Sequence, residues 1–388
     1  MERTADVIIV GAGIVGSAIA YFTTLYGLKT IVVDRGLPAN GTSSACEGNI
    51  LVSDKELGPE LELTQYSLRV WKEDLQEFGH LWEFESKGGI IVASKESSLA
   101  SLQRFSESQR AHGITATALS LDELRELEPN IRPTALGASW YPEDAQVQPM
   151  LATFHLLRMA RERGAKFYPN TPVQNIMVAE DNSVRGIQTN NGEFYAPVIV
   201  NAAGTWAGEV AKTVQVDIPI NPRRGFVMVT VPLPPMVFHK VYAAEYVDNV
   251  GSSDAGLQSS PVVEGTPAGS ILIGSSRERV GFDQSISVQA LQTIATNAIE
   301  LFPFLAKVKI LRHYHGFRPY CPDHLPVIGH DTQVPGLVHA AGHEGAGIGL
   351  SVGTGKLVAQ AILGHDTDLP LDAFTPDRFL AASGAHHG

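Results

Sequence analysis

Three glycines near the start of the chain have the spacing that brings a protein backbone up to a phosphate group. The segment that holds them follows the apolar run 7–10 and opens a helical pattern: Gly11-Ala12-Gly13-Ile14-Val15-Gly16. Gly11 permits a tight turn, Gly13 lets the backbone approach a pyrophosphate, and Gly16 lets the helix pack closely on the strands. The free amides at the helix N-terminus suit an anion. The pattern therefore predicts a nucleotide-binding turn.

A carboxylate stands where such a turn needs a second contact. The apolar run 30–33 ends at Asp34 and Arg35, about 20 residues beyond the glycines. At this spacing an acid accepts a hydrogen bond from a ribose hydroxyl. We expect Asp34 to do so, and we include Arg35 among the nucleotide contacts.

An arginine in an apolar and aromatic setting could bind a substrate. It lies in Gly316-Phe317-Arg318-Pro319, and its guanidinium could hold a carboxylate through two parallel hydrogen bonds. The alternative is a surface or ion-pair role. Tyr242 and Tyr246, on a predicted strand over 240–247, could reach a substrate amine or carboxylate, although the residue type favours packing.

A second glycine turn, over 342–349, lies between a predicted strand (337–341) and a predicted helix (350–363). It is not a second dinucleotide fingerprint, because Leu350 stands where the third glycine is needed. What remains is a helix N-terminus suited to partial negative charge, such as reduced flavin carries near N1 and the C2 carbonyl. A turn that serves packing alone is the alternative.

Composition bounds the remaining possibilities. A chain of 388 residues exceeds the size of one growing core, so we expect two lobes. The formal charge of -12 argues against a nucleic-acid partner. Only two cysteines are present, too few for a disulfide framework and without the spacing of a metal site, so we expect no metal and a reducing cytoplasm.

The apolar stretch 7–33 is interrupted by glycines and a pair of threonines. It therefore predicts a buried strand and helix and no membrane span. Peripheral attachment at the inner face of the membrane stays open.

The elements that must position these residues follow from periodicity. Loop-forming residues fill 36–49, and 248–269 is predicted to be a long surface loop. Apolar spacing predicts helices over 59–78, 121–127, 149–163 and 287–302. Further strands are predicted over 88–92, 198–200, 225–232 and 271–275.

In combination, these motifs resemble the glycine oxidase, D-amino acid oxidase and sarcosine oxidase family of flavoproteins over nearly the whole chain. The N-terminal turn carries the resemblance together with four further motifs: Thr42-Ser43-Ser44 with Gly48-Asn49, residues 200–206, residues 316–319 and residues 342–348. Residues 274–283 are most similar to the flavin subunits of opine oxidase, hydrogen cyanide synthase and D-hydroxyproline dehydrogenase complexes.

The resemblance implies an α/β fold, α+β overall. A Rossmann-like FAD-binding lobe would comprise residues 1–85, 145–222 and 316–388. A second, substrate lobe, built on a mainly antiparallel sheet, would comprise residues 86–144 and 223–315.

The resemblance also implies contacts with FAD. Thr42, Ser43, Ser44, Gly48 and Asn49 would line the flavin, and Val173 would meet the adenine through its backbone. The remaining contacts would come from Ala203, Gly204, Trp206, Gly316, Arg318, His343, Glu344, Gly345, Ala346, Gly347 and Ile348. Gly316 stands where sarcosine oxidases carry a flavin-linking cysteine, so we expect non-covalent FAD.

The implied reaction is oxidation of the CH-NH bond of a small amino or imino acid: a D-amino acid, glycine, a proline derivative or an opine. Hydride would pass to flavin N5, the imine would hydrolyse in water, and Arg318 would orient the carboxylate. Partner subunits of a dehydrogenase complex, and oxygen or another electron acceptor, all stay open. Two alternatives are an electron-relay or assembly flavin subunit and a pyridine-nucleotide oxidoreductase, the latter disfavoured by the missing second fingerprint.

Overall fold

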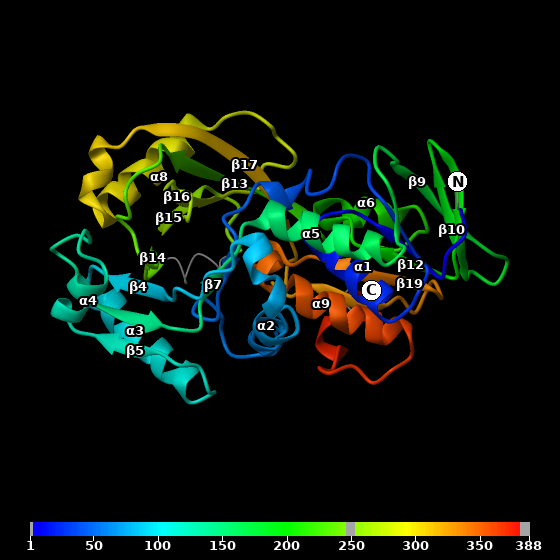
Figure 1. Cartoon of the computed structure of the whole chain (residues 1–388), viewed down its shortest axis with the longest axis horizontal. Coiled ribbons are helices and arrows are strands. Elements are labelled where there is room, and N and C mark those ends of the chain that lie inside the picture. The colour runs from blue at the N-terminus through cyan, green and yellow to red at the C-terminus, as the bar shows by residue number, and fades with distance from the viewer. Residues whose placement is uncertain (1–2, 246–252, 381–388) are drawn as a thin grey trace, which may run out of the picture.

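The computed structural model describes residues 3–245 and 253–380 and contains two large sheets, which lie at opposite ends of the molecule (Figure 1). The helices of the described chain are α1 Ile14–Leu25, α2 Pro59–Arg69, α3 Glu96–Arg110, α4 Leu121–Leu127, α5 Pro149–Glu162, α6 Ala207–Lys212, α8 Val288–Leu301 and α9 Gly347–Ile362. The mixed α/β fold that the sequence predicts is confirmed.

A six-stranded sheet carries the N-terminal turn. Its order is β18 (Val327–His330), β19 (Leu337–Ala341), β12 (Val198–Asn201), β1 (Val7–Val10), β2 (Thr30–Val33) and β8 (Lys166–Tyr168), and only the β18–β19 pair is antiparallel. This is the Rossmann-like lobe, assembled from distant parts of the sequence.

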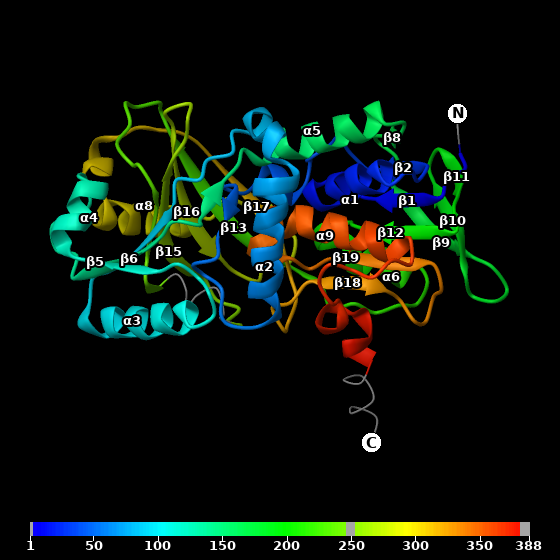
Figure 2. The same cartoon turned by 60° about the horizontal axis from the view of Figure 1, so that its bottom comes forward.

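The two faces of this sheet are covered differently, as the alternation of side chains along a strand requires. Val7 and Ile9 pack toward α1 and its neighbours α5 and α9, and Figure 2 shows α1 between those two helices. Ile8 and Val10 pack against α6 and a three-stranded sheet of β9 (Val173–Val178), β10 (Val184–Thr189) and β11 (Gly192–Tyr195). The strand is therefore apolar on both faces, which explains its unbroken hydrophobic run.

The second sheet has eight strands and is mainly antiparallel. Its order is β17 (Ile310–Tyr320), β13 (Asn221–Thr230), β16 (Ile271–Arg277), β15 (Gln258–Gly265), β14 (Lys240–Ala243), β4 (Gly89–Ala93), β6 (Gly137–Tyr141) and β5 (Thr117–Leu119). Only the β14–β4 pair is parallel. Helix α8 covers one face through Ala290, Ile294 and Ala298. The opposite face, which we call the inner face, carries Tyr242 and Val262 and joins the core of the six-stranded lobe.

Two short strands complete the sheets: β3 (Asn49–Ile50) pairs with β7 (Ala145–Gln146). The proposed lobe boundary at residue 316 falls within β17. As a result, Gly316 and Arg318 sit on the large antiparallel sheet while facing the Rossmann-like lobe.

Some sequence predictions need correction. The surface loop predicted over 248–269 is wrong, because β15 lies within it at the centre of the large sheet. The helix predicted over 59–78 is regular only through Arg69, after which a π-helical turn (Val70–Asp74) and a 3-10 segment (Gln76–Trp82) follow. The final helix begins at Gly347, three residues before its predicted start.

Among residues 3–245 and 253–380, no helix combines the length and apolar character needed to cross a bilayer.

Candidate active site

A cavity of about 530 Å³ lies between the ends of the parallel strands and the inner face of the large sheet. Most of the predicted site residues line it, although they come from distant segments. They are Gly11, Gly13, Ile14, Val15, Asp34, Arg35, Thr42, Ser43, Gly48, Asn49, Val173, Ala203, Gly204, Trp206, Gly316, Arg318, His343, Glu344, Gly345, Gly347 and Ile348.

The N-terminal turn is built so that only glycine fits it. Gly11 has φ +113°, and a Cβ there would lie 2.4 Å from the carbonyl oxygen of Ala202. A Cβ on Gly16 would lie 2.0 Å from the Gly11 oxygen. Gly16 therefore serves the close approach of helix to strand and does not itself line the cavity.

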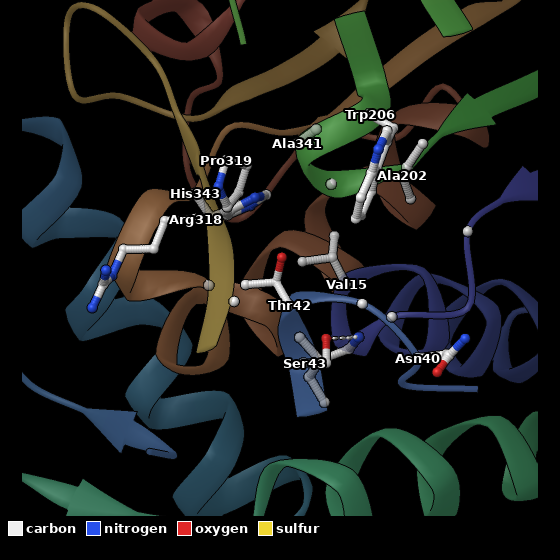
Figure 3. Close-up of a pocket in the computed structure, with 18 of the residues that line it drawn as sticks. Val15, Asn40, Thr42, Ser43, Ala202, Trp206, Arg318, Pro319, Ala341 and His343 are labelled. Carbon is white, nitrogen blue, oxygen red and sulfur yellow. Dashed lines mark hydrogen bonds between the residues drawn. The ribbon is translucent and has the colours of Figure 1, made fainter. Parts of the chain in front are cut away.

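The loop after β2 ties the turn to the large sheet. The hydroxyl of Ser43 accepts a hydrogen bond of 3.0 Å from the backbone N–H of Ile14, at the start of α1 (Figure 3). Thr42 donates a bond of 2.6 Å to the carbonyl oxygen of Phe317 on β17. These two side chains fix the loop between the two sheets.

The Asp34 carboxylate is held by backbone donors. It accepts bonds of 2.7 Å from the N–H of Ala12 and from that of Gly36. Beside it, the Arg35 guanidinium carbon lies 3.7 Å from the centre of the Trp206 ring, a cation–π contact. This end of the cavity therefore offers an oriented carboxylate and a stacked cationic plane.

Arg318 lies at the other end, on the inner face. Its Nη1 donates a bond of 2.8 Å to the carbonyl oxygen of Ser276. Figure 3 shows its side chain extending away from Trp206 and Asn40. An arginine held in this way presents a planar set of donors to an acidic ligand.

The C-terminal glycine turn contributes the N-terminus of α9 and two polar side chains. Burial lowers the pKa of His343 to about 3, and its Nε2 pairs with the Thr354 hydroxyl at 3.0 Å, so the ring is neutral. Burial opposes ionisation of Glu344, but bonds from His324 and from Arg223 (2.6 Å) lower its pKa. Glu344 is therefore an ionised residue committed to protein partners.

Four predicted residues lie elsewhere in the described chain. Gly16, Ser44 and Ala346 do not line the cavity, and the Ser44 hydroxyl donates instead to the Gly41 oxygen. Tyr242 is fully buried in the core with its hydroxyl paired to that of Ser53, so it does not reach the cavity. Tyr246 lies outside the described residues.

Sequence reasoning missed several residues that line the cavity. The most informative are Asn40, Cys46, Glu47 and Gly225. Glu47 was detectable as a single acid within a loop of small residues. Burial raises the pKa of Cys46 to about 12, so this thiol stays protonated.

The arrangement fits an extended dinucleotide such as FAD. Gly11 and Gly13 of the N-terminal turn and Gly347 and Ile348 at the start of α9 line the same cavity, and a helix N-terminus favours an anionic group. The carboxylate of Asp34 stands at one end and the guanidinium of Arg318 at the other. The residues present can therefore hold both the nucleotide and the redox ring.

Comparison with known proteins agrees with this geometry. The chain matches the DAO family, described as FAD dependent oxidoreductase, over residues 6–361. The hydrogen cyanide synthase subunit HcnC of Pseudomonas aeruginosa is 28% identical over 98% of this chain and 97% of its own length. A glycine oxidase of Geobacillus kaustophilus is 29% identical over 99% and 100%. The bifunctional protein ThiO/ThiG of Trichormus variabilis is 29% identical over 97% of this chain but only 55% of its own length, so the chain spans about half of that relative.

Solved structures share the whole fold. The L-proline dehydrogenase from P. horikoshii superposes with a TM-score of 0.90 at 24% identity, covering 98% of this chain and 99% of that one. The glycine oxidase from Geobacillus kaustophilus gives 0.88 at 25% identity, covering 97% and 99%. The chain therefore belongs to the DAO family of FAD-dependent oxidoreductases.

Proposed function

We propose that this enzyme oxidises the CH-NH bond of a small amino or imino acid whose carboxylate binds Arg318. One observation carries the proposal: Arg318 lines the same cavity as the N-terminal glycine turn and the start of α9. A ligand on Arg318 would therefore lie next to the redox ring of a dinucleotide held by those two turns.

The chain's own groups divide the work. The amides of the N-terminal turn would hold the pyrophosphate of FAD, and Asp34 would accept a hydrogen bond from its ribose. Arg318 orients the substrate through its carboxylate. FAD, when bound, supplies the two-electron acceptor. The imine product needs only water for its hydrolysis, so no protein base is required for that step.

The names of relatives support an amino-acid substrate. They include glycine oxidase and sarcosine dehydrogenase among related sequences, and L-proline dehydrogenase and iminodiacetate oxidase among related structures. One relative is named as a subunit of hydrogen cyanide synthase, which supports partner subunits as part of the proposal.

The test is anaerobic mixing of the FAD-loaded protein with glycine, sarcosine, D- and L-proline, iminodiacetate and an opine. We expect at least one to bleach the flavin absorbance. Arg318→Ala should then weaken binding of that substrate by about 1.5 to 3 kcal/mol, as for a charged hydrogen bond. Unchanged binding would refute the role of Arg318.

Two further readouts separate the alternatives. A relay subunit would not bleach with any amino acid, whereas a pyridine-nucleotide oxidoreductase would bleach with NADH or NADPH. Comparing oxygen consumption with reduction of an artificial dye then shows which acceptor the enzyme uses.

A further inference from the structure

Glu47 is a buried carboxyl group on the cavity wall with one oxygen unused. The residue is 7% exposed, and its Oε1 has no hydrogen-bond partner. The Asn49 side chain bonds to the same carboxyl group. A buried acceptor without a donor is costly, and such groups in native proteins call for an explanation.

Gly274 on β16 leaves the space that the Glu47 carboxyl group occupies. A Cβ on Gly274 would lie 2.2 Å from Oε1 of Glu47, so the carboxyl group packs directly on the backbone of β16. Gly274 pairs with Val262, and Val262 in turn pairs with Tyr242, on the inner face. Glu47 therefore reaches from the cofactor loop to the inner face.

Charged groups flank Glu47 on this face. The Lys240 ammonium contacts Glu264 and Asn49, and Lys240 and Glu264 are each 1% exposed. Arg318 also attracts the Glu47 carboxylate, and the charge of Glu47 raises the pKa of Tyr314. Burial raises the pKa of Glu47, while Lys240 and Arg318 oppose that shift. Two cations and two carboxyl groups thus lie close together, and of these four groups Arg318 and Glu47 line the cavity.

We propose that the Glu47 carboxylate accepts a hydrogen bond from the substrate's amino or imino nitrogen while Arg318 holds its carboxylate. This inference rests on the proposed function and extends it to the second charged group of the substrate. An amino acid presents one cation and one anion across a single carbon, and the cavity wall offers the complementary pair.

The assignment narrows the class of substrate. The preferred ligands carry at least one N–H and a positive charge, as primary and secondary amino acids do. 2-Hydroxy acids lack both the N–H and the charge, so they should bind less well than an amino acid of the same size.

The experiment compares two ligands on FAD-loaded protein. One is whichever of glycine, sarcosine or proline bleaches the wild-type flavin, with its Kd taken from the concentration dependence of anaerobic bleaching. The other is its amine-free counterpart, acetate or cyclopentanecarboxylate, titrated by its effect on the flavin absorption spectrum. The second readout involves no turnover.

Glu47→Gln should weaken binding of the amino acid at least tenfold and leave the amine-free acid unchanged or bound more tightly, because a negative charge is lost. Glu128→Gln is the matched control: Glu128 is also buried with an unpartnered oxygen, but it bonds His239 outside the cavity. The Glu128→Gln variant should leave the Kd of both ligands unchanged.

Glu47→Asp serves as the second variant, because it keeps the charge but moves the carboxylate back by one methylene group. It should lower the preference for the amino acid several-fold with the amine-free acid unchanged. Equal weakening of both ligands, or no change in either, would overturn the assignment. A wild-type protein that no amino acid bleaches or perturbs would instead overturn the proposed function, and this assignment with it.

Discussion

A Cβ on Gly225 would lie 2.0 Å from Nη1 of Arg318, so the guanidinium group occupies space that this glycine leaves open. The same Cβ would lie 2.4 Å from the carbonyl oxygen of Ser276, to which Arg318 donates. Gly225 on β13 pairs with Gly316 on β17, and a Cβ on Gly316 would lie 2.5 Å from the Cβ of Ala45. Gly225 thus leaves space for the Arg318 guanidinium, and Gly316 leaves space for the cofactor loop at Ala45.

Gly225→Ala should therefore impair substrate binding without preventing FAD binding. The new methyl group cannot fit without disturbing the bond from Arg318 to Ser276. We expect the Kd of the best carboxylate ligand to rise by about tenfold, the lower range for a charged hydrogen bond. Titration of the flavin spectrum measures it.

Gly79→Ala is the control, because its Cβ would make an ordinary contact of 3.5 Å with Phe84, away from the cavity. It should bind the ligand like the wild type. A Gly225→Ala protein with unchanged Kd would show that the guanidinium adjusts freely.

The N-terminal turn provides a second prediction, on cofactor retention. Gly11 and Gly27 both have positive φ, +113° and +85°. Alanine at either costs about 1 to 2 kcal/mol of backbone strain. At Gly11 the Cβ would also meet the Ala202 oxygen, whereas at Gly27 nothing lies within 4 Å. Gly11→Ala should thus be isolated with little FAD.

Gly27→Ala should retain FAD fully, and its free energy of unfolding should fall only by the cost of the backbone strain. The ratio of flavin absorbance to protein absorbance after purification measures both variants. Equal FAD content in the two would mean that the turn tolerates a side chain.

How much of this site the sequence could predict depends on whether a residue's role is local. Gly11 and Asp34 line the cavity as their short local pattern predicts, whereas a site role for Arg318 was implied mainly by the family resemblance. The cavity assembles them by pairing of distant strands. That assembly followed only from the family resemblance.

Residues whose role is set by distant neighbours could not be predicted. Strand β15 contains Ser259, Pro261 and Glu264, which read as loop residues, and the register shifts between Ser259 and Val262. Glu264 is buried because Lys240 on the adjacent strand pairs with it. Tyr242 shows the reverse: its hydroxyl was a candidate for substrate contact, but it forms a hydrogen bond with the Ser53 hydroxyl inside the core.

The two thiols lead to a prediction on FAD attachment. Burial raises the pKa of both Cys46 and Cys321 to about 12, so neither is a thiolate at neutral pH. Since the thiolate is the nucleophile, neither should bond to the flavin. Precipitation of the yellow protein with acid should release all of the flavin to the supernatant. A pellet that stays yellow after washing would contradict this.

The raised pKa of Asp144 leads to a prediction of how the free energy of unfolding changes with pH. This fully buried carboxyl group accepts a bond of 2.9 Å from the N–H of Val52 and also contacts Ser53. Burial raises its pKa to about 7, far above its ordinary value, so the folded state binds the proton more tightly than the unfolded state. Its stabilising contribution is complete below pH 4 and declines as pH rises toward about 7.

Asp144→Asn removes this titration while leaving an oxygen to accept from Val52. The variant's free energy of unfolding, relative to wild type, should therefore rise between pH 4.5 and pH 8, by an amount on the order of 3 kcal/mol for a shift of this size. Urea unfolding of both FAD-loaded proteins at several pH values measures the difference. Because other titrating groups are common to the two proteins, they cancel in that difference. A difference that stays constant with pH would mean that Asp144 ionises as readily in the folded protein as in the unfolded chain.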